Sequence, residues 1–169
     1  MQDLTPQVPA WPATRERTTL RTATNVGAMD EIDEPIVERL PLAAPRPLTA
    51  EERALLEALL RHPGSKPELT EQAKTVQVDA TCSCGCPSVF LAVDDGAPPA
   101  IYSDADSPLG AGAVQLRASV GESGGPEVIL HVLEGRMAEL EIWAGGYGIR
   151  PHVDPTELVY DQGHFPSDQ

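Results

Sequence analysis

The chain has 169 residues, 17 of them prolines, and a formal net charge of −14 at pH 7. A length of this order allows one ordinary domain plus a tail. The negative net charge argues against binding to nucleic acid, because binding of its phosphate groups needs clustered lysine and arginine residues. No apolar run approaches the roughly 18 to 20 residues that span a bilayer, so we expect no membrane partner. The polar N-terminus lacks a signal-peptide pattern, which favours a cytoplasmic protein.

Residues 1–46 are expected to form a disordered, proline-rich tail, since six prolines in this range interrupt any helix or central strand. A short apolar motif at 31–42 differs from the rest, because its aliphatic residues recur at helical spacing. This motif either docks onto a partner protein or folds back over an apolar strip of its own domain. The residues that would make the partner contact are Ile32, Ile36, Val37 and Leu40.

The folded domain is expected over 47–160, and it opens with two short helices. In the segment LTAEERALLEALLRHP, Thr49 and Glu52 form a capping box, the leucines make one apolar stripe, and Pro63 ends the helix. A second capping box follows at Ser65 and Glu68. The spacing of the two start signals predicts helices joined by a tight corner.

The hydrophobic period then changes from helical to two, which is typical of strands. Alternating segments occur at 75–81, 88–94, 113–119 and 127–144, with a looser one at 100–106. Glu134 and Gly135 interrupt the clearest segment and predict a hairpin, because glycine can take the positive φ of a tight turn. The sequence therefore predicts an α+β fold. Two short N-terminal helices would pack on an antiparallel meander of five or six strands, preceded by the disordered tail and followed by a flexible C-terminus at 161–169.

All three cysteines lie in the segment TCSCGCPSVF, between two expected strands, at Cys82, Cys84 and Cys86. Alternate residues of a flat strand are about 6.6 Å apart, so thiolates that share one metal ion require the chain to curl, which Gly85 and Pro87 allow. Three cysteines also leave a tetrahedral zinc ion one ligand short. The candidates for the fourth ligand are a partner subunit and the histidines His131, His152 and His62.

Three interpretations of this cluster stay open. The paired C-x2-C spacing of structural zinc sites is absent, and so is the C-x-x-C signature of thiol oxidoreductases. Free cysteines are among the most buried residues of proteins and behave as small apolar groups. The cluster is therefore a structural turn, a zinc site or a thiol-redox site, and the spacing favours the structural turn over the other two.

No other motif predicts catalysis. The sequence has no G-x-S-x-G elbow, no Ser-His-Asp order and no phosphate-binding glycine loop. The glycine-rich AGGYG at 144–148 is interpreted as a flexible turn, and the aromatic Trp143, Tyr147 and Tyr160 as part of the core. We expect a non-enzymatic acidic binding or adaptor protein that uses no cofactor and whose partner is another protein. Zinc binding is the first alternative, and a thiol-redox enzyme is the second.

The segment C-x-C-G-C-P-S follows a capped leucine-rich helix and precedes a hairpin that ends in AELEIW. In these features the chain resembles a group of small actinobacterial proteins with no established activity. The resemblance covers about residues 48–158 and leaves the N-terminal tail out. It therefore implies domain limits and source, and no function.

Overall fold

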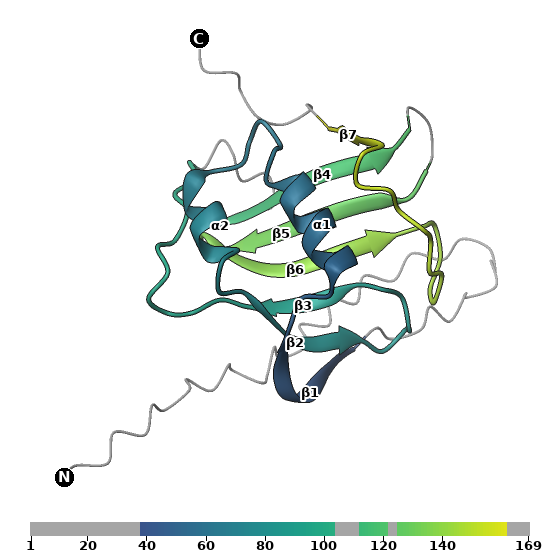
Figure 1. Cartoon of the computed structure of the whole chain (residues 1–169), viewed down its shortest axis with the longest axis horizontal. Helices are drawn as coiled ribbons and strands as arrows, with labels where there is room; N and C mark the ends of the chain where they lie inside the picture. Colours follow the sequence, from purple (N-terminus) through teal and green to yellow (C-terminus); the bar gives the residue numbers. More distant parts are fainter. Residues whose placement is uncertain (1–37, 104–111, 122–124, 162–169) are drawn as a thin grey trace, which may run out of the picture. The chain divides into compact units, whose positions relative to one another are not determined.

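The computed structural model describes residues 38–103, 112–121 and 125–161, which form one seven-stranded sheet and two short helices (Figure 1). All neighbouring strands are antiparallel, in the spatial order β1-β2-β3-β6-β5-β4-β7. In chain order the elements are β1 (Arg39–Pro47), α1 (Ala50–Leu59), α2 (Pro67–Gln72), β2 (Gln77–Cys82), β3 (Val89–Ala92), β4 (Ala113–Val120), β5 (Glu127–Leu133), β6 (Arg136–Trp143) and β7 (Leu158–Tyr160).

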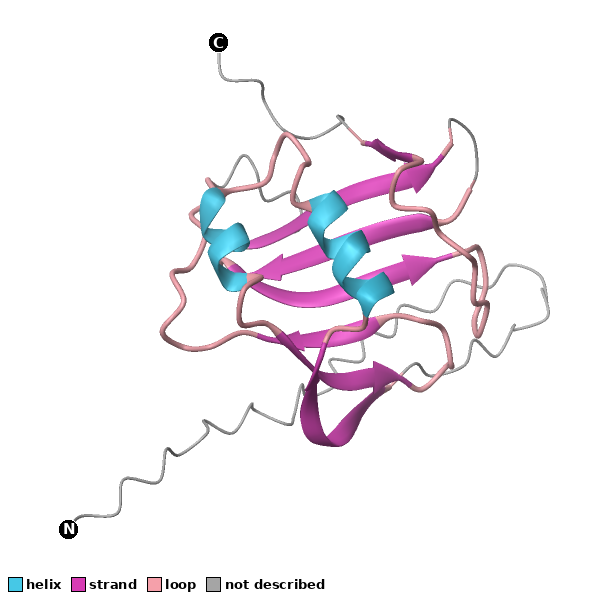
Figure 2. Ribbon diagram, viewed as in Figure 1, coloured by secondary structure: helices cyan, strands magenta, loops and turns pink. Residues whose placement is uncertain are grey.

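Both helices lie on one face of the sheet (Figure 2), where α1 contacts β4 and β5 and α2 contacts β6. The leucine stripe of the first helix explains this arrangement, because it buries Leu55, Leu56 and Leu59 against the alternating apolar residues of the strands. Leu69 adds the contribution of α2. The strand residues that complete this core include Val114, Leu116, Val128, Leu130, Val132 and Leu140.

The two helices begin in different ways. At α1 the predicted capping box is confirmed: Thr49 Oγ1 accepts a hydrogen bond from the Glu52 N–H at 3.2 Å, and Glu52 Oε2 accepts one from the Thr49 N–H at 2.7 Å. At α2 the predicted box is wrong, because the N-cap is Lys66, which makes no side-chain cap, and Pro67 occupies the first helical position. Neither described helix is long and apolar enough to cross a membrane.

The predicted fold class is wrong in three respects. The described chain has seven strands and not five or six, and β1 precedes the helices, which are therefore not the N-terminal elements of the domain. The strands also do not form one meander, because β3 pairs with β6 and the chain reaches β6 only after β4 and β5. The expected strand at 100–106 is not formed over 100–103, the part of it that the structure describes.

Prolines are the physical reason why β1 was missed. Pro41, Pro45 and Pro47 all lie in this strand, which occupies an edge of the sheet and pairs with β2 alone. An edge strand tolerates proline, because the absent N–H removes no ladder bond when it faces outward. Leu40 lies in β1 and is exposed. The other residues of the predicted partner motif (Ile32, Ile36 and Val37) lie outside the described residues.

A buried glutamine joins α2 to the β5–β6 hairpin. The hairpin turn has positive φ at Glu134 and Gly135, as its sequence predicts. Gln72 is fully buried, and its Nε2 donates to the carbonyls of Pro98 and Gly135, each at 2.8 Å. Its Oε1 accepts from the Met137 N–H at 3.0 Å. One side chain thus hydrogen-bonds to three backbone groups, and two of these three bonds are buried.

We expect Gln72→Leu to lower the free energy of unfolding by about 2–4 kcal/mol, because it removes three hydrogen bonds at once, two of them buried. Denaturation in urea measures this loss. Gln77→Leu is the matched control, since Gln77 is exposed at the start of β2 and its replacement should change stability by less than about 0.5 kcal/mol. Equal unfolding midpoints for the two variants would show that the Gln72 bonds do not stabilise the helix–hairpin contact.

Candidate metal centre

The cysteines occupy the connection between two strands. Cys82 is the last residue of β2, and β3 begins at Val89. Between them the chain turns back on itself, and the Gly85 N–H donates to the Cys82 carbonyl at 3.3 Å. Gly85 has a φ of +79°, a conformation that side chains with a Cβ rarely adopt. The glycine therefore permits the curl that alternate cysteines need in order to meet.

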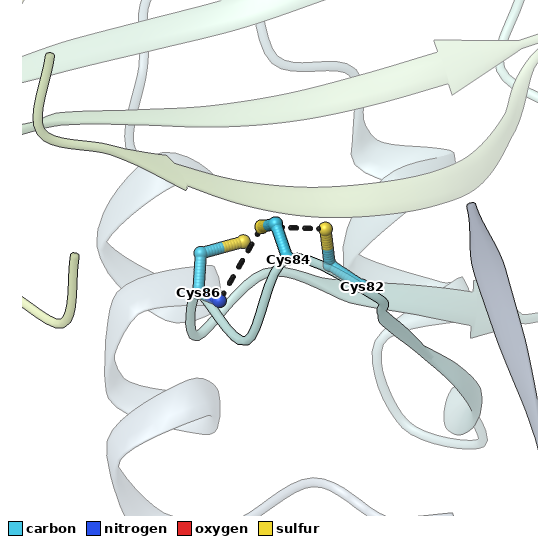
Figure 3. A group of neighbouring side chains, drawn as sticks. All are labelled: Cys82, Cys84 and Cys86. Atoms are coloured by element: carbon cyan, nitrogen blue, oxygen red, sulfur yellow. Dashed lines mark hydrogen bonds between the residues drawn. The ribbon is translucent and has the colours of Figure 1, made fainter. Parts of the chain in front are cut away.

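The three sulfurs of this cysteine turn (Cys82–Cys86) lie within 4.8 Å of one another. Figure 3 shows them pointing toward a common region, with Cys84 in the middle. The Cys82 and Cys84 sulfurs are 2.9 Å apart, and all three cysteines are free. In the part of the chain that the structure describes, no histidine, aspartate or glutamate joins this group.

The middle cysteine, Cys84, is more acidic than Cys82. Burial opposes its ionisation, but hydrogen bonds from the Cys82 and Cys86 thiols and from the N–H groups of Cys86 and Gly148 lower the pKa of Cys84 to about 7. Burial raises the pKa of Cys82 to about 12, and its hydrogen bond to Cys84 adds to that rise. Of Cys82 and Cys84, Cys84 is therefore the one that forms a thiolate more readily.

A second segment of the chain contacts the cysteine turn. A Cβ added to Gly148 would lie 3.0 Å from the Cys84 carbonyl oxygen, so the two segments approach closely there, and Arg150 Nε donates to the Gly85 carbonyl at 2.8 Å. Both residues belong to the segment that follows β6, more than sixty positions away in the sequence. From the sequence we interpreted this glycine-rich segment as a flexible turn. Nothing in its composition indicates which other part of the chain it contacts. We refer to residues 144–150 as the clamp loop.

A cavity of about 680 Å³ borders the cysteine turn on the side of α1. Its size falls in the range of small-molecule sites. Arg46 and Glu52 cross one wall as a two-bonded ion pair, with distances of 2.7 and 2.8 Å between guanidinium nitrogens and carboxylate oxygens. Burial opposes ionisation of Glu52, but the hydrogen bond from Arg46 outweighs it with the help of Thr49 and lowers the pKa of that carboxyl. The remaining walls include Cys82, Cys86, Arg150, His152 and Asp154.

The structure does not bring His131 to the cysteines. It lies on β5, and β3 and β6 separate that strand from β2, which amounts to about 14 Å at about 4.8 Å per strand. His131 Nε2 instead contacts Glu141 Oε2 at 2.7 Å, and Nδ1 contacts Gln115 Nε2 at 3.2 Å. The hydrogen bond with His131 lowers the pKa of Glu141. This histidine belongs to a polar network on the strands.

The other candidate histidines are also placed. His62 is buried beyond the end of α1, where Nδ1 accepts from the Gly64 N–H at 2.9 Å and Nε2 contacts the Asp161 carbonyl at 2.9 Å. These bonds occupy both ring nitrogens. His152 is exposed on the rim of the cavity that borders the cysteine turn. Of the three histidines, His152 alone lines a wall together with cysteines.

The scarce aromatic residues divide between the core and the surface. Tyr160 packs against the core and its hydroxyl donates to the Ala58 carbonyl at 2.9 Å, as predicted. Trp143 and Tyr147 are 38% and 43% exposed, so their assignment to the core is wrong. Their rings meet edge to face with centroids 5.9 Å apart, and Ile149 of the clamp loop is also exposed. Three exposed apolar side chains therefore lie on or beside the clamp loop.

Compared with known proteins, the chain matches no protein-family model, no curated protein and no solved structure.

In reduced, metal-free protein we expect iodoacetamide to modify Cys84 with a half-maximal rate near pH 7, because its thiolate forms there. Cys82 should react at least about a hundred times more slowly at the same pH, since its thiol stays protonated. Peptide fragmentation by mass spectrometry distinguishes the two positions. A half-maximal rate near pH 8.5 for Cys84, or faster modification of Cys82, would contradict the hydrogen-bond pattern of the turn.

Proposed function

We propose that this protein binds one thiophilic metal ion, zinc in the first place, through Cys82, Cys84 and Cys86. Its role is metal binding in the cytoplasm, without catalysis. The observation that carries the proposal is the convergence of three sulfurs within 4.8 Å on a single turn. Thiolates are preferred ligands of zinc, and a reducing cytoplasm keeps such thiols available.

The distances support a shared ion. Zinc–sulfur bonds of about 2.3 Å in a tetrahedral arrangement place neighbouring sulfurs about 3.8 Å apart. The Cys82–Cys84 separation of 2.9 Å must then open by about 0.9 Å, and the widest separation must close by at most about 1 Å. Small side-chain rotations on a turn achieve both changes. The backbone of the turn is therefore already suited to the ion.

The number of ligands indicates what kind of zinc site this is. Structural zinc sites use four protein ligands, whereas sites with three protein ligands keep a position for water or another small ligand. The main core cluster between helices and sheet does not include the cysteines, although Cys82 itself is buried at the end of β2. We therefore expect the chain to fold without the ion. These features favour an exchangeable zinc ion over a structural one.

Elemental analysis of protein purified without added metal should find about one zinc per chain if the three thiolates form the site. Cys84→Ser should reduce this content the most, because Cys84 is the central ligand, and Cys82→Ser and Cys86→Ser should each reduce it as well. His131→Ala is the control and should keep the metal. Because soft thiolates also suit Cu(I), the analysis should quantify copper too.

Zinc should raise the melting temperature of the metal-free protein, since the ion binds the folded chain. Removal of zinc by a chelator should leave the circular dichroism spectrum unchanged, because the core lies elsewhere. Substoichiometric metal together with three freely titratable thiols would contradict the proposal. Complete unfolding on chelation would instead indicate a structural site.

Protein binding, the first interpretation of the sequence, stays a proposal alongside metal binding. The exposed pair of Trp143 and Tyr147 favours it, because aromatic side chains are enriched in protein interfaces. Affinity capture with the full chain tests it against a Trp143→Ser/Tyr147→Ser variant. A partner that is retained by the unaltered chain and lost by the variant would support an adaptor role. The absence of any partner that depends on these two residues would contradict it.

A further inference from the structure

Two contacts connect the clamp loop to the cysteine turn. The backbone of Gly148 lies so close to Cys84 that an added Cβ would be 3.0 Å from the Cys84 carbonyl oxygen, and Arg150 Nε donates to the Gly85 carbonyl at 2.8 Å. Gly85 and Cys84 are adjacent, so the loop contacts the turn at two consecutive residues. The clamp loop therefore limits where the middle cysteine can move.

The approach of Gly148 to the turn requires a glycine for two reasons. Its φ is +69°, and a Cβ added there would lie 3.0 Å from the Cys84 carbonyl oxygen. Gly145, in the same loop, has a similar φ of +77°, but a Cβ added to it would meet no atom within 4 Å. The two glycines share a backbone conformation and differ in their contact with the cysteine turn.

We propose that Gly148 and Arg150 are positioning residues of the cysteine centre, which hold the backbone of the turn at Cys84 and Gly85 in the conformation that binds the metal ion. The inference rests on the proposed metal binding. Groups that contact metal ligands from outside orient them, and the loss of such a partner typically weakens metal affinity by about 10- to 100-fold. Here the contacts are made to the backbone of the turn.

The loop therefore adds an outer shell to a site whose ligands come from five consecutive residues. A short peptide of alternating cysteines has no means of fixing its own middle sulfur. Here a distant segment contacts the backbone at Cys84 and Gly85, in addition to the local N–H of Cys86, which donates to the Cys84 sulfur at 3.4 Å. Arg150 contacts the next residue of the turn. Its Nε donates to the Gly85 carbonyl and so stabilises the positive-φ conformation of Gly85 on which the curl depends.

Zinc competition with a chelator tests the assignment. We expect Gly148→Ala to weaken zinc binding by about tenfold or more, because its Cβ displaces the loop from Cys84. Gly145→Ala is the matched control, since it places alanine at the same kind of φ without touching the turn, and we expect a change below about threefold. The sulfur-to-cobalt charge-transfer band of the cobalt-substituted protein supplies a readout of the ligand itself. This charge-transfer band should move to longer wavelength in Gly148→Ala and keep its position in Gly145→Ala.

Arg150→Gln keeps the test decisive if Gly148→Ala fails to fold, because it leaves the backbone conformation alone. It should also weaken zinc binding by about tenfold. Its control is Arg136→Gln, since Arg136 likewise donates to backbone carbonyls, those of Asp94 and Asp95, away from the cysteines. Equal affinities and spectra for each variant and its control would overturn the assignment, even with zinc bound at full stoichiometry.

Amide hydrogen exchange separates failure of this inference from failure of the proposed metal binding. If the unaltered protein binds no metal, the metal proposal is contradicted, and the contact between loop and turn is judged on the backbone of the turn alone. The amides of residues 83–86 should then exchange faster in Gly148→Ala and Arg150→Gln than in the unaltered chain, with the two controls unchanged. Unchanged exchange rates in all four variants would contradict the positioning role as well.

Discussion

The constraint on which the candidate site depends is the curl of the chain between β2 and β3. An extended strand would hold alternate cysteines about 6.6 Å apart, which is too far for one metal ion to bridge. The left-handed conformation of Gly85 removes this obstacle and gathers three sulfurs within 4.8 Å. The curl also turns the carbonyl of Gly85 outward, where Arg150 binds it. The geometry of the sulfurs and the contact with the clamp loop both follow from one backbone conformation.

Two opposing effects set the chemistry of the thiols. Burial favours the neutral form at Cys82 and Cys84, but at Cys84 hydrogen-bond donors outweigh it. The sulfurs are therefore unequal before any ligand arrives. One is ready to ionise near neutral pH, and the neighbour that donates to it is held in the thiol form. A metal ion bound by all three sulfurs would remove this difference in ionisation, because its charge stabilises all three thiolates and releases their protons.

Some local features of the fold were predictable from the sequence, whereas long-range ones were not. The capping box expected at Ser65 and Glu68 is a local feature that is not formed. The capping box of Thr49 and the hairpin at Gly135 depend on neighbouring residues, and both are formed as predicted. The edge strand β1 was missed because Pro41 is unfavourable in most strands, and the sequence does not tell which strand lies at an edge. For the site, the curl at Gly85 was foreseeable from residue types. The role of Gly148 was not, since a glycine's contact with a segment more than sixty residues away leaves no local pattern.

X-ray absorption at the zinc edge of the zinc-loaded protein tests the central claim most directly, because it measures the atoms bound to the ion. Three converging cysteines predict three sulfur neighbours at about 2.3 Å and one lighter neighbour, nitrogen or oxygen, at about 2.0 Å. The same spectrum from Cys84→Ser should show fewer sulfur neighbours. A first shell made only of nitrogen and oxygen would contradict the account, since the ion would then bind away from Cys82, Cys84 and Cys86.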